Sequence, residues 1–572
     1  MKKMNTTIDS LYEEASTLHA SGKITEAIER LEHIIQRSPD SKAALRLLGV
    51  IFAQKGEMDK ASHYLKLNTE LEPFDASLHN NLANAYKILR KFPKALFHYQ
   101  EALKYQPDYP EAHNNLATLY ASQNQYLQAL QHYRFALHSR PDFIDAHFNL
   151  GLLLLKHNEP NAAKKQFNNV ITLVPNHVQA TFYLGVLALE ANALKEAEEK
   201  FFDVLKQDPE HVQALTNLGV IALKNEQGQV AIDYFTKALS LDNDFEEARN
   251  NLAGTFIHHD RFENALVHYE ILLKKNPKCV EYLYNSGVAQ MALGQLQKSI
   301  ELFENILRSE PDHFATLNNL AAVFVKLHDR AKAIELLNRA LKVNPHDEAT
   351  QFIYDAYTGT NKQSPASADY ARHLFDNYAL YYDQHLQGPL NYTLPHHIGQ
   401  LLHRLQINHV KKTIDLGAGT GLCGIVLREI SDYLVGVDIS KKMLSLAGSK
   451  GIYDELLESE LITHLKQQRH YDMAVAADVL PYLGELNTLF SLLHERLSTN
   501  GLFIFSHEIS EHEPWELQTS ARFCHHPDYI KKLCDEYQFK MIDTQKVVAR
   551  HQDNQALPMM LCFAVRVYTH ST

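Results

Sequence analysis

Residues 413–424 read TIDLGAGTGLCG, a short apolar run that reaches an aspartate and continues into glycines at alternate positions. The apolar run predicts a buried β-strand, and the glycines predict a turn whose backbone a ligand approaches closely. A dinucleotide fold would place its third glycine one residue later, at Leu422, in the pattern G-x-G-x-x-G. The spacing therefore favours a ligand other than a dinucleotide. The glycines are Gly417, Gly419 and Gly421.

Two acidic residues add a chemical argument about this ligand. A pyrophosphate needs a helix N-terminus without a carboxylate nearby, whereas an amino-acid tail carries both an ammonium and a carboxylate. Asp415 can face the ammonium, while backbone N–H groups at the start of the next helix face the carboxylate. Asp438 closes the next apolar run, LVGVDIS, and is placed to accept hydrogen bonds from both hydroxyls of a ribose.

Apolar β-rich runs alternate with helical stretches through the same part of the chain. This alternation predicts a doubly wound α/β sheet, completed by a late pair of strands that resembles a hairpin. The runs are KTIDLG, YLVGVDIS, YDMAVAAD, GLFIFSHE, FKMIDTQKVVARH and MMLCFAVRVY.

The chain up to residue 347 repeats every 34 residues. The eighth and twentieth residues of each unit are small and the twenty-fourth is large, so two helices are expected to cross closely at the small residues. The pattern resembles the tetratricopeptide repeat, a helix-turn-helix unit, over residues 8–347, with EATQFIYDAY as a closing helix. A proline recurs at the same position of each repeat, except in one repeat where Asn243 occupies that position. The prolines are Pro39, Pro73, Pro107, Pro141, Pro175, Pro209, Pro277, Pro311 and Pro345.

The sixth position of most repeats is asparagine. In the tetratricopeptide arrays that this one resembles, notably that of the O-linked N-acetylglucosamine transferase, this asparagine faces a groove and holds the backbone of an extended peptide. An amide suits that role because it donates and accepts at once. The alternative is that asparagine fills a consensus position and caps local backbone groups. The column consists of Asn81, Asn115, Asn149, Asn217, Asn251, Asn285 and Asn319.

The motif D-L-G-A-G-T-G, together with Asp438, resembles the class I S-adenosylmethionine-dependent methyltransferases. Segments such as FDNYALYYDQHLQGPLNYTLP and YDMAVAADVLPYLGELN resemble the bacterial methyltransferases that carry tetratricopeptide repeats at their N-terminus. The resemblance implies S-adenosyl-L-methionine as cofactor and leaves the methyl acceptor open. It places Glu460 and Leu461 at the adenine, although aspartate is commoner than glutamate there.

The same resemblance assigns three further residues. Asp478 is implied to lie beside the transferring methyl group, and Tyr378 and Tyr382 are candidates to cover the cofactor. Aromatic residues at that spacing are also typical of core or cap packing.

We therefore expect an α + α/β fold, in which an N-terminal tetratricopeptide α-superhelix precedes a Rossmann-like class I methyltransferase domain. Residues 8–358 are predicted to form the repeat array, with ten repeats plus a capping helix. The polar stretch 359–367 reads as a linker, and residues 368–572 as the methyltransferase domain.

The net charge limits the possible partners, and the cysteines and the first residues indicate the cellular compartment. A formal net charge of -12 argues against binding to nucleic acid or to an anionic membrane. Five scattered cysteines and a start, MKKMNTTIDSLYEEAS, without an apolar core predict a cytoplasmic protein. No metal site is expected, because HEISEH at 507–512 has the wrong spacing for a zinc protease and the side chains around His526 point apart.

Methyl transfer needs alignment of the nucleophile with the methyl group and removal of any proton. His507, Glu508 and His525 are candidates for the base, and Arg522 and His525 are candidates to shape the acceptor pocket. The leading hypothesis is a methyltransferase whose repeat groove docks a protein that is, or carries, the acceptor. The alternatives are a small-molecule methyltransferase whose repeats serve assembly, and a non-catalytic scaffold that binds the cofactor. The oligomeric state stays open.

Overall fold

The computed structural model describes residues 7–363, 366–387, 392–552 and 555–567. Residues Met1–His268 and Tyr269–Thr572 form two compact units, which we describe separately. Among the described helices, none has the length and apolar character of a membrane span.

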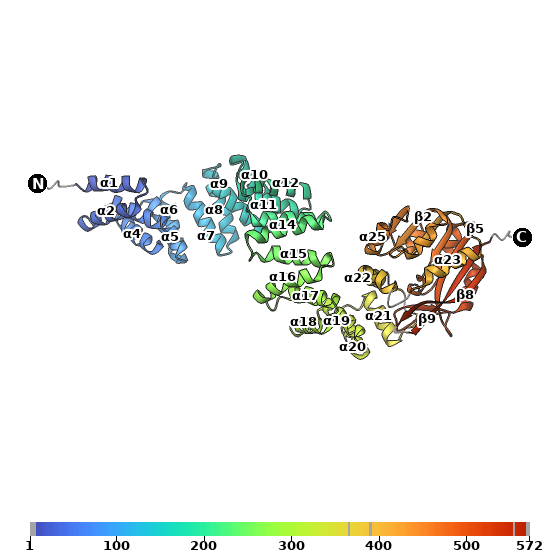
Figure 1. Ribbon diagram of the computed structural model, residues 1–572. Coiled ribbons are helices and arrows are strands. Elements are labelled where there is room, and N and C mark those ends of the chain that lie inside the picture. The colour runs from blue at the N-terminus through green and yellow to red at the C-terminus, as the bar shows by residue number, and fades with distance from the viewer. Residues whose placement is uncertain (1–6, 364–365, 388–391, 553–554, 568–572) are drawn as a thin grey trace. The chain divides into compact units, whose positions relative to one another are not determined.

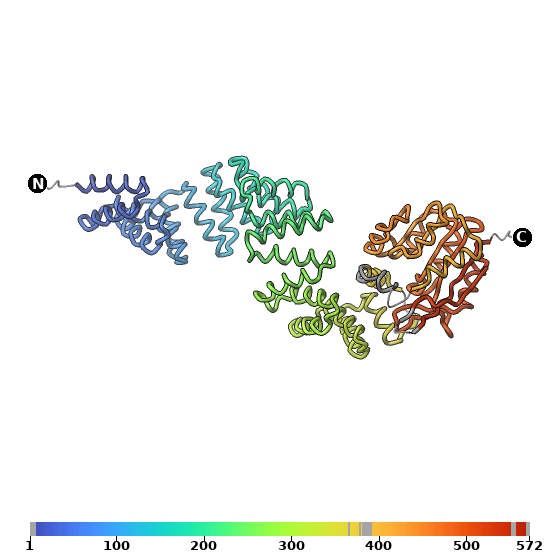
Figure 2. The backbone as a smooth tube through the Cα atoms, viewed as in Figure 1, coloured from blue at the N-terminus to red at the C-terminus, as the bar shows by residue number. Residues whose placement is uncertain are grey.

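The predicted repeats are present as pairs of helices, each pair followed by the next along the chain (Figure 2). Each pair turns at a residue with a left-handed backbone, with φ between 56° and 79°, at the fifteenth position of the repeat. Only three of these ten residues are glycine, so no column of glycines in the sequence marks the left-handed position within the predicted turn. They are Gly22, Gly56, Arg90, Asn124, Asn158, Asn192, Glu226, Asp260, Gly294 and His328.

The repeat helices have regular lengths. They are α1 (Ile8–Ala20), α2 (Ile24–Arg37), α3 (Lys42–Gln54), α4 (Met58–Leu71), α5 (Ala76–Ile88), α6 (Phe92–Tyr105), α7 (Pro110–Ser122), α8 (Tyr126–Ser139), α9 (Ile144–Lys156), α10 (Pro160–Leu173), α11 (Val178–Glu190), α12 (Leu194–Gln207), α13 (Val212–Lys224), α14 (Gly228–Leu241), α15 (Glu246–His258), α16 (Phe262–Lys275), α17 (Val280–Ala292), α18 (Leu296–Ser309), α19 (Phe314–Lys326) and α20 (Arg330–Val343), followed by α21 (Glu348–Thr358).

Small and large residues meet in each helix pair, as the period predicts. A Cβ atom added to Gly151 would lie 2.6 Å from the ring of Phe167, and one added to Gly185 would lie 2.8 Å from the ring of Phe201. The glycines therefore leave room for a ring on the second helix of the pair. The large residues are at most 2% exposed; they are Leu31, Leu65, Tyr99, Tyr133, Phe167, Phe201, Phe235, Tyr269, Phe303 and Leu337.

The C-terminal part of the second unit, orange to red in Figure 1, is built around one mixed sheet. Its strand order is β3-β2-β1-β4-β5-β7-β6, and β9 pairs with both β5 and β8. From β3 to β7 along this order each strand is parallel to the next, whereas β6 is antiparallel to β7. Strand β9 is antiparallel to both β5 and β8. The four predicted strands and the late pair are confirmed; β3, β6 and β7 were not expected. The strands are β1 (Val410–Leu416), β2 (Ser431–Asp438), β3 (Glu455–Glu458), β4 (Tyr471–Ala476), β5 (Leu497–Ile509), β6 (Trp515–Leu517), β7 (Phe523–His525), β8 (Phe539–Gln552) and β9 (Gln555–Arg566).

Helices accompany this sheet as the predicted α/β alternation requires. Leu401 and Leu427 pack in a core with Ile504 and Phe563, and a second core contains Phe490 and Phe505. The helices are α22 (Ala368–Gln387), α23 (Leu394–Arg404), α24 (Leu422–Arg428), α25 (Lys441–Ser449), α26 (Leu461–Leu465), the short 3-10 helix η1 (Leu480–Tyr482), α27 (Asn487–Arg496) and α28 (Pro527–Glu536).

Helix α21, which follows the last repeat, packs against the β6–β7 hairpin. Phe352 and Ala356 share a buried cluster with Leu517 and Phe523. In the stretch predicted as a linker, Lys362 forms an ion pair of 2.9 Å with Glu516. The predicted domain boundaries stay predictions. The apolar cluster shows that helix α21 and the β6–β7 hairpin bury apolar surface against each other.

Candidate functional site

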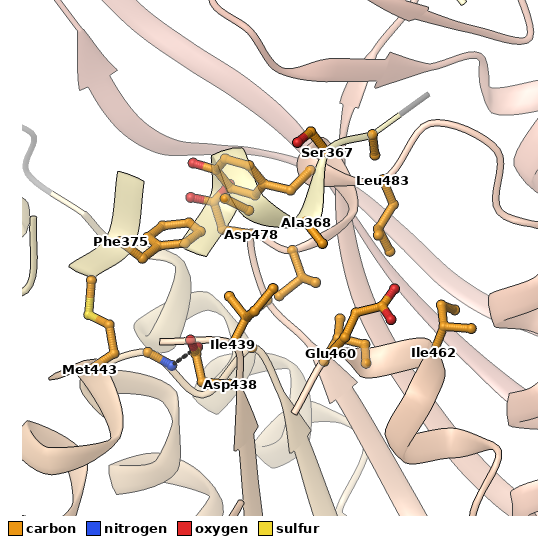
Figure 3. Close-up of a pocket in the computed structure, with 18 residues that line it drawn as sticks. Ser367, Ala368, Phe375, Asp438, Ile439, Met443, Glu460, Ile462, Asp478 and Leu483 are labelled. Carbon is orange, nitrogen blue, oxygen red and sulfur yellow. Dashed lines mark hydrogen bonds between the residues drawn. The ribbon is translucent and has the colours of Figure 1, made fainter. Parts of the chain in front are cut away.

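A pocket lies where β1, β2 and β4 end, and the start of α22 covers it. It contains about 860 Å³ of space, part of it open to solvent. Ala368 and Phe375 of α22 lie across the pocket from Asp438 and Glu460 (Figure 3). Ligand sites of open α/β sheets occur at this edge, beyond the carboxyl ends of the strands.

The glycine turn forms one wall of the pocket. Gly417, Gly419 and Gly421 have φ of 72°, 54° and 89°, values that L side chains rarely adopt. Gly417 and Gly419 line the pocket, and Gly421 precedes α24 as its N-cap. A Cβ atom on Gly417 would also lie closer than 3.0 Å to Val479, so this glycine is needed for both its conformation and its size.

Asp438 ends β2 and faces the pocket. One of its carboxylate oxygens accepts from the backbone N–H of Gly419 at 2.8 Å, and the other accepts from that of Ser440 at 2.9 Å. Burial raises the pKa of Asp438, and these backbone donors oppose that shift. The two hydrogen bonds fix the carboxylate at the end of the strand, where a ribose would be recognised.

Asp415 lies behind the turn and not in the pocket wall. Its side chain is 1% exposed, and its Oδ2 atom accepts from the hydroxyl of Tyr453 at 2.7 Å. Burial raises the pKa of Asp415 to about 7, because the charged form is poorly solvated; the Tyr453 hydrogen bond lowers it and Asp438 raises it. Contact of Asp415 with an ammonium group stays a prediction.

The structure describes the residues that are predicted to contact the adenine, but not the side chains that are predicted to cover the cofactor. Leu461 and Ile462 line the pocket at the start of α26, and the exposed Glu460 accepts from the Thr463 hydroxyl at 2.7 Å. Tyr378 and Tyr382 belong to α22, but their side chains lie outside the described part of the chain. The described part of α22 is fixed by the Ser440 hydroxyl, which donates to Asp376 at 2.6 Å.

Asp478 follows β4 and is held by two arginines. It has φ of 57°, its N–H donates to the Ser506 hydroxyl at 2.8 Å, and its carboxylate pairs with Arg522 and lies 3.6 Å from Arg550. Arg522 also donates to Tyr482 at 2.6 Å. Such pairing rigidifies the part of the wall formed by Asp478 and Tyr482.

Glu508, one of the predicted bases, belongs to the same cluster. It accepts from Nε of Arg522 at 2.6 Å and lies 3.6 Å from Arg550. Two carboxylates therefore face two guanidinium groups. This explains how four charged side chains are accommodated in a mostly buried position.

The two histidines proposed as bases are buried away from the pocket. His507 and His525 are 1% and 0% exposed, and neither is among the described residues that line it. Burial lowers the pKa of each to about 4. One ring nitrogen of His525 is hydrogen-bonded to the carbonyl of Gly484 at 2.8 Å, and its role as a base stays a prediction. Among the described residues, no group of three His, Cys, Asp or Glu side chains is arranged to hold a metal.

The asparagine column is partly exposed, and several of its amides bond to the neighbouring repeat. Asn115 donates to Asn80 at 3.1 Å and Asn149 donates to Asn114 at 3.2 Å, in each case one repeat back. Asn217 instead donates to the carbonyl of Gln213 at 3.0 Å. These bonds satisfy one donor of each amide and leave the binding role of the column a prediction.

Tyr453 was not expected from the sequence. Its ring lies against three glycines, since a Cβ atom on Gly421, Gly424 or Gly436 would lie within 3.1 Å of it. Gly424 and Gly436 are outside the G-x-G-x-G motif, and two additional glycines close to the motif are the signal that could have indicated a large neighbour.

Comparison with protein families confirms the two predicted parts. Models of the tetratricopeptide repeat match residues 18–85, 76–109, 98–131, 148–206, 203–248, 251–314 and 290–352, and a model described as TPR repeat matches 117–158. A model described as methyltransferase domain matches residues 390–544.

Individual relatives cover only part of the chain. An uncharacterized protein of Haemophilus influenzae is 32% identical over 124 residues, which are 18% of this chain and 48% of that protein. The biotin biosynthesis bifunctional protein BioHC of Saccharophagus degradans is 29% identical over 138 residues, 23% of each chain. The chain thus spans about half or less of the length of these relatives. A crystal structure of the tetratricopeptide protein YrrB is 26% identical, with a TM-score of 0.29, over 32% of this chain and 95% of that one.

Fold, pocket and family matches together define the class. The chain is a tetratricopeptide-repeat protein with a C-terminal Rossmann-like methyltransferase domain.

Proposed function

We propose that the C-terminal domain binds S-adenosyl-L-methionine in the pocket between the glycine turn and α22. The observation that carries this proposal is the meeting of Gly417, Gly419 and Asp438 in one pocket wall. The other residues fit the same molecule: Ile439 and Leu461 offer apolar surface to an adenine, and the buried Asp415 offers a negative charge to an ammonium group.

When bound, S-adenosyl-L-methionine supplies an activated methyl group on a sulfonium. The chain then has to hold the cofactor and to align the acceptor with its methyl group. Asp438 accepts from the ribose hydroxyls, while Ala368 and Phe375 cover the pocket and exclude water. Asp478 and Tyr482, fixed by Arg522, form the wall that an acceptor would meet, so their task is to orient it.

We further propose that the repeats dock a protein that is, or carries, the methyl acceptor, in the cytoplasm. The support is the column of partly exposed amides on the first helix of the repeats from Asn81 in α5 to Asn251 in α15, interrupted at Tyr183 in α11. Each of these amides can bond to a peptide backbone with the groups that it does not use internally.

One observation favours a second candidate, a small-molecule methyltransferase whose repeats serve assembly. The bonds from Asn115 to Asn80 and from Asn149 to Asn114 are the local role expected of structural asparagines. Under this interpretation the column stabilises the stack of repeats and reads no partner.

Transfer of a labelled methyl group distinguishes the two candidates. The full chain is incubated with methyl-labelled S-adenosyl-L-methionine and a cell extract, and label is counted separately in protein and in small molecules. Each lost hydrogen bond contributes about 0.5–1.5 kcal/mol, so changing Asn115, Asn149, Asn217 and Asn251 to alanine should reduce protein labelling at least about tenfold. Circular dichroism confirms that the helices persist.

The expected control result is unchanged cofactor affinity in this variant, because the four asparagines belong to the other unit. Equal labelling of proteins by the wild type and the variant would refute docking through the column. Label found only in small molecules, in equal amounts, would establish the second candidate.

A further inference from the structure

The Tyr453 side chain occupies a slot built from glycines. A Cβ atom on Gly424 would lie closer than 3.0 Å to the Tyr453 hydroxyl, and one on Gly436 would lie 2.9 Å from its ring. On the third side, a Cβ atom on Gly421 would lie 3.1 Å from the same ring. The slot draws on α24, its N-cap and β2, so it fixes the ring in one place.

The slot directs the hydroxyl of Tyr453 to one target, the buried Asp415. The hydroxyl lies 2.7 Å from Oδ2 of Asp415 and donates to it. Burial and the neighbouring Asp415 raise the pKa of Tyr453, so the phenol keeps its proton and remains a donor. A hydrogen bond to a carboxylate favours the charged form of that carboxylate.

Asp415 is two residues before Gly417, which lines the pocket. Its carboxylate is 1% exposed, and the attraction between a buried charge and an ammonium in the adjoining pocket is little weakened by water. The charge on Asp415 therefore matters for any ligand that brings an ammonium group to the glycine turn.

We propose that Tyr453 is a positioning residue for ammonium recognition: it holds the Asp415 carboxylate in place and ionised beneath the glycine turn. The inference rests on the proposed binding of S-adenosyl-L-methionine. It assigns to Tyr453 a role in affinity for the amino-acid tail of the cofactor and none in affinity for the nucleoside.

The titratable groups that act on Asp415 come from three neighbouring elements. They are Tyr453 before β3, Asp438 at the end of β2 and Cys423 in α24. Asp438 also has a raised pKa, but it faces the ribose, so its effect appears with any ligand that contains the nucleoside. A pair of ligands with and without the amino-acid tail therefore isolates Asp415.

The test compares S-adenosylhomocysteine with 5′-methylthioadenosine, which lacks the amino-acid tail, by calorimetry on the full chain between about pH 6 and about pH 8.5. In the wild type, the affinity for S-adenosylhomocysteine relative to 5′-methylthioadenosine should rise as Asp415 ionises near its pKa of about 7. In Tyr453→Phe this rise should move to higher pH, and S-adenosylhomocysteine should bind about tenfold more weakly at neutral pH. Affinity for 5′-methylthioadenosine should not change.

Two further variants complete the design. Asp415→Asn should abolish the pH-dependent difference between the two ligands. Tyr471→Phe is the matched control, because it removes a buried hydroxyl that lies 3.0 Å from His464 and should leave both affinities and both pH profiles as in the wild type.

The inference is overturned if Tyr453→Phe binds both ligands as the wild type does, or if it weakens both equally at every pH. If the wild type itself binds neither ligand, the proposed cofactor fails instead, so the two failures are distinguishable. Tyr453→Phe fits the same slot, and its circular dichroism and thermal unfolding are compared with the wild type to confirm the fold.

Discussion

Glycine serves different purposes in the repeats and in the methyltransferase turn. Gly151, Gly185 and Gly219 lie inside helices and leave space for a phenylalanine ring on the following helix. Gly417 and Gly421 lie outside helices and have φ of 72° and 89°. The first group is needed for its small volume alone, whereas the second is needed for its backbone conformation, with an added need for space at Gly417. The difference teaches that a glycine in the repeats can be replaced if its partner shrinks, whereas a glycine in the turn cannot.

The largest effect is expected for Gly417→Ala. A left-handed backbone costs an L-residue about 1–2 kcal/mol, and contact with Val479 adds an overpacking cost of about 1–3 kcal/mol. We expect the free energy of unfolding to fall by the sum of these costs and S-adenosylhomocysteine binding to weaken. Urea unfolding and calorimetry measure the two effects.

The companion variant Gly417→Ala/Val479→Ala sharpens the comparison. It removes the contact but not the backbone cost, so it should recover only part of the stability. Full recovery would show that the turn glycine is needed for space alone and would remove the difference between the two regions.

A smaller effect is expected for Gly219→Ala in the repeats. The added methyl would lie closer than 3.0 Å to the ring of Phe235, an overpacking cost of about 1–3 kcal/mol, but alanine in a helix gains about 1 kcal/mol over glycine. We expect a net loss of about 1 kcal/mol in the free energy of unfolding, measured with urea.

In the repeats, a smaller partner residue should restore the stability that the alanine substitution removes. Gly219→Ala/Phe235→Leu recreates the pair that the chain itself uses at Ala15 and Leu31, both fully buried. A double-mutant cycle should therefore show favourable coupling between the two substitutions. Additive effects would contradict the packing explanation.

The last comparison concerns titration, which acts in opposite directions in the two regions. In the repeats, burial and the neighbouring histidine lower the pKa of His98 and His132 to about 4; their Nδ1 atoms lie 3.0 Å and 2.9 Å from those of His79 and His113. Their contribution is complete above the unfolded pKa of about 6.5 and is lost as the pH falls toward 4.

Asp415 behaves in the opposite way. Its raised pKa means that its contribution to stability is complete below the unfolded value near 3.8 and is lost as the pH rises through about 7. His98→Gln/His132→Gln should flatten the acid side of the stability profile, because glutamine does not titrate. The chain already has glutamine at the equivalent position of the next repeat, where Gln166 lies 2.7 Å from His147. Asp415→Asn should flatten the neutral side. Urea midpoints measured across pH would refute the assignment if either variant kept the wild-type profile.

Prediction from the sequence works best where the determining contacts are local. The contact of Gly151 with Phe167 spans half a repeat and recurs along the chain, so the 34-residue period reveals it. The strand, turn and helix around Asp415 are likewise contiguous. The left-handed residue between the paired helices could not be predicted, because this position is often not glycine; in two repeats it is Arg90 and Glu226.

Contacts between distant segments could not be predicted in the same way. No local pattern joins Phe352 of α21 to Phe523 of β7, or Asp478 to Arg522, and the hydrogen bond from Tyr453 to Asp415 depends on the β-sheet bringing them together. For this reason His507 and His525 resembled available bases in the sequence, whereas both are buried in the structure.

The central claim, that the pocket beside Asp438 binds S-adenosyl-L-methionine, is tested most directly by calorimetric titration of the full chain with S-adenosylhomocysteine. We predict one site per chain, little or no binding of NADH, and an affinity loss of about 1–3 kcal/mol in Asp438→Ala, because the ribose hydroxyls lose a charged acceptor. Tighter binding of NADH than of S-adenosylhomocysteine, or an Asp438→Ala variant that binds as the wild type does, would contradict the account.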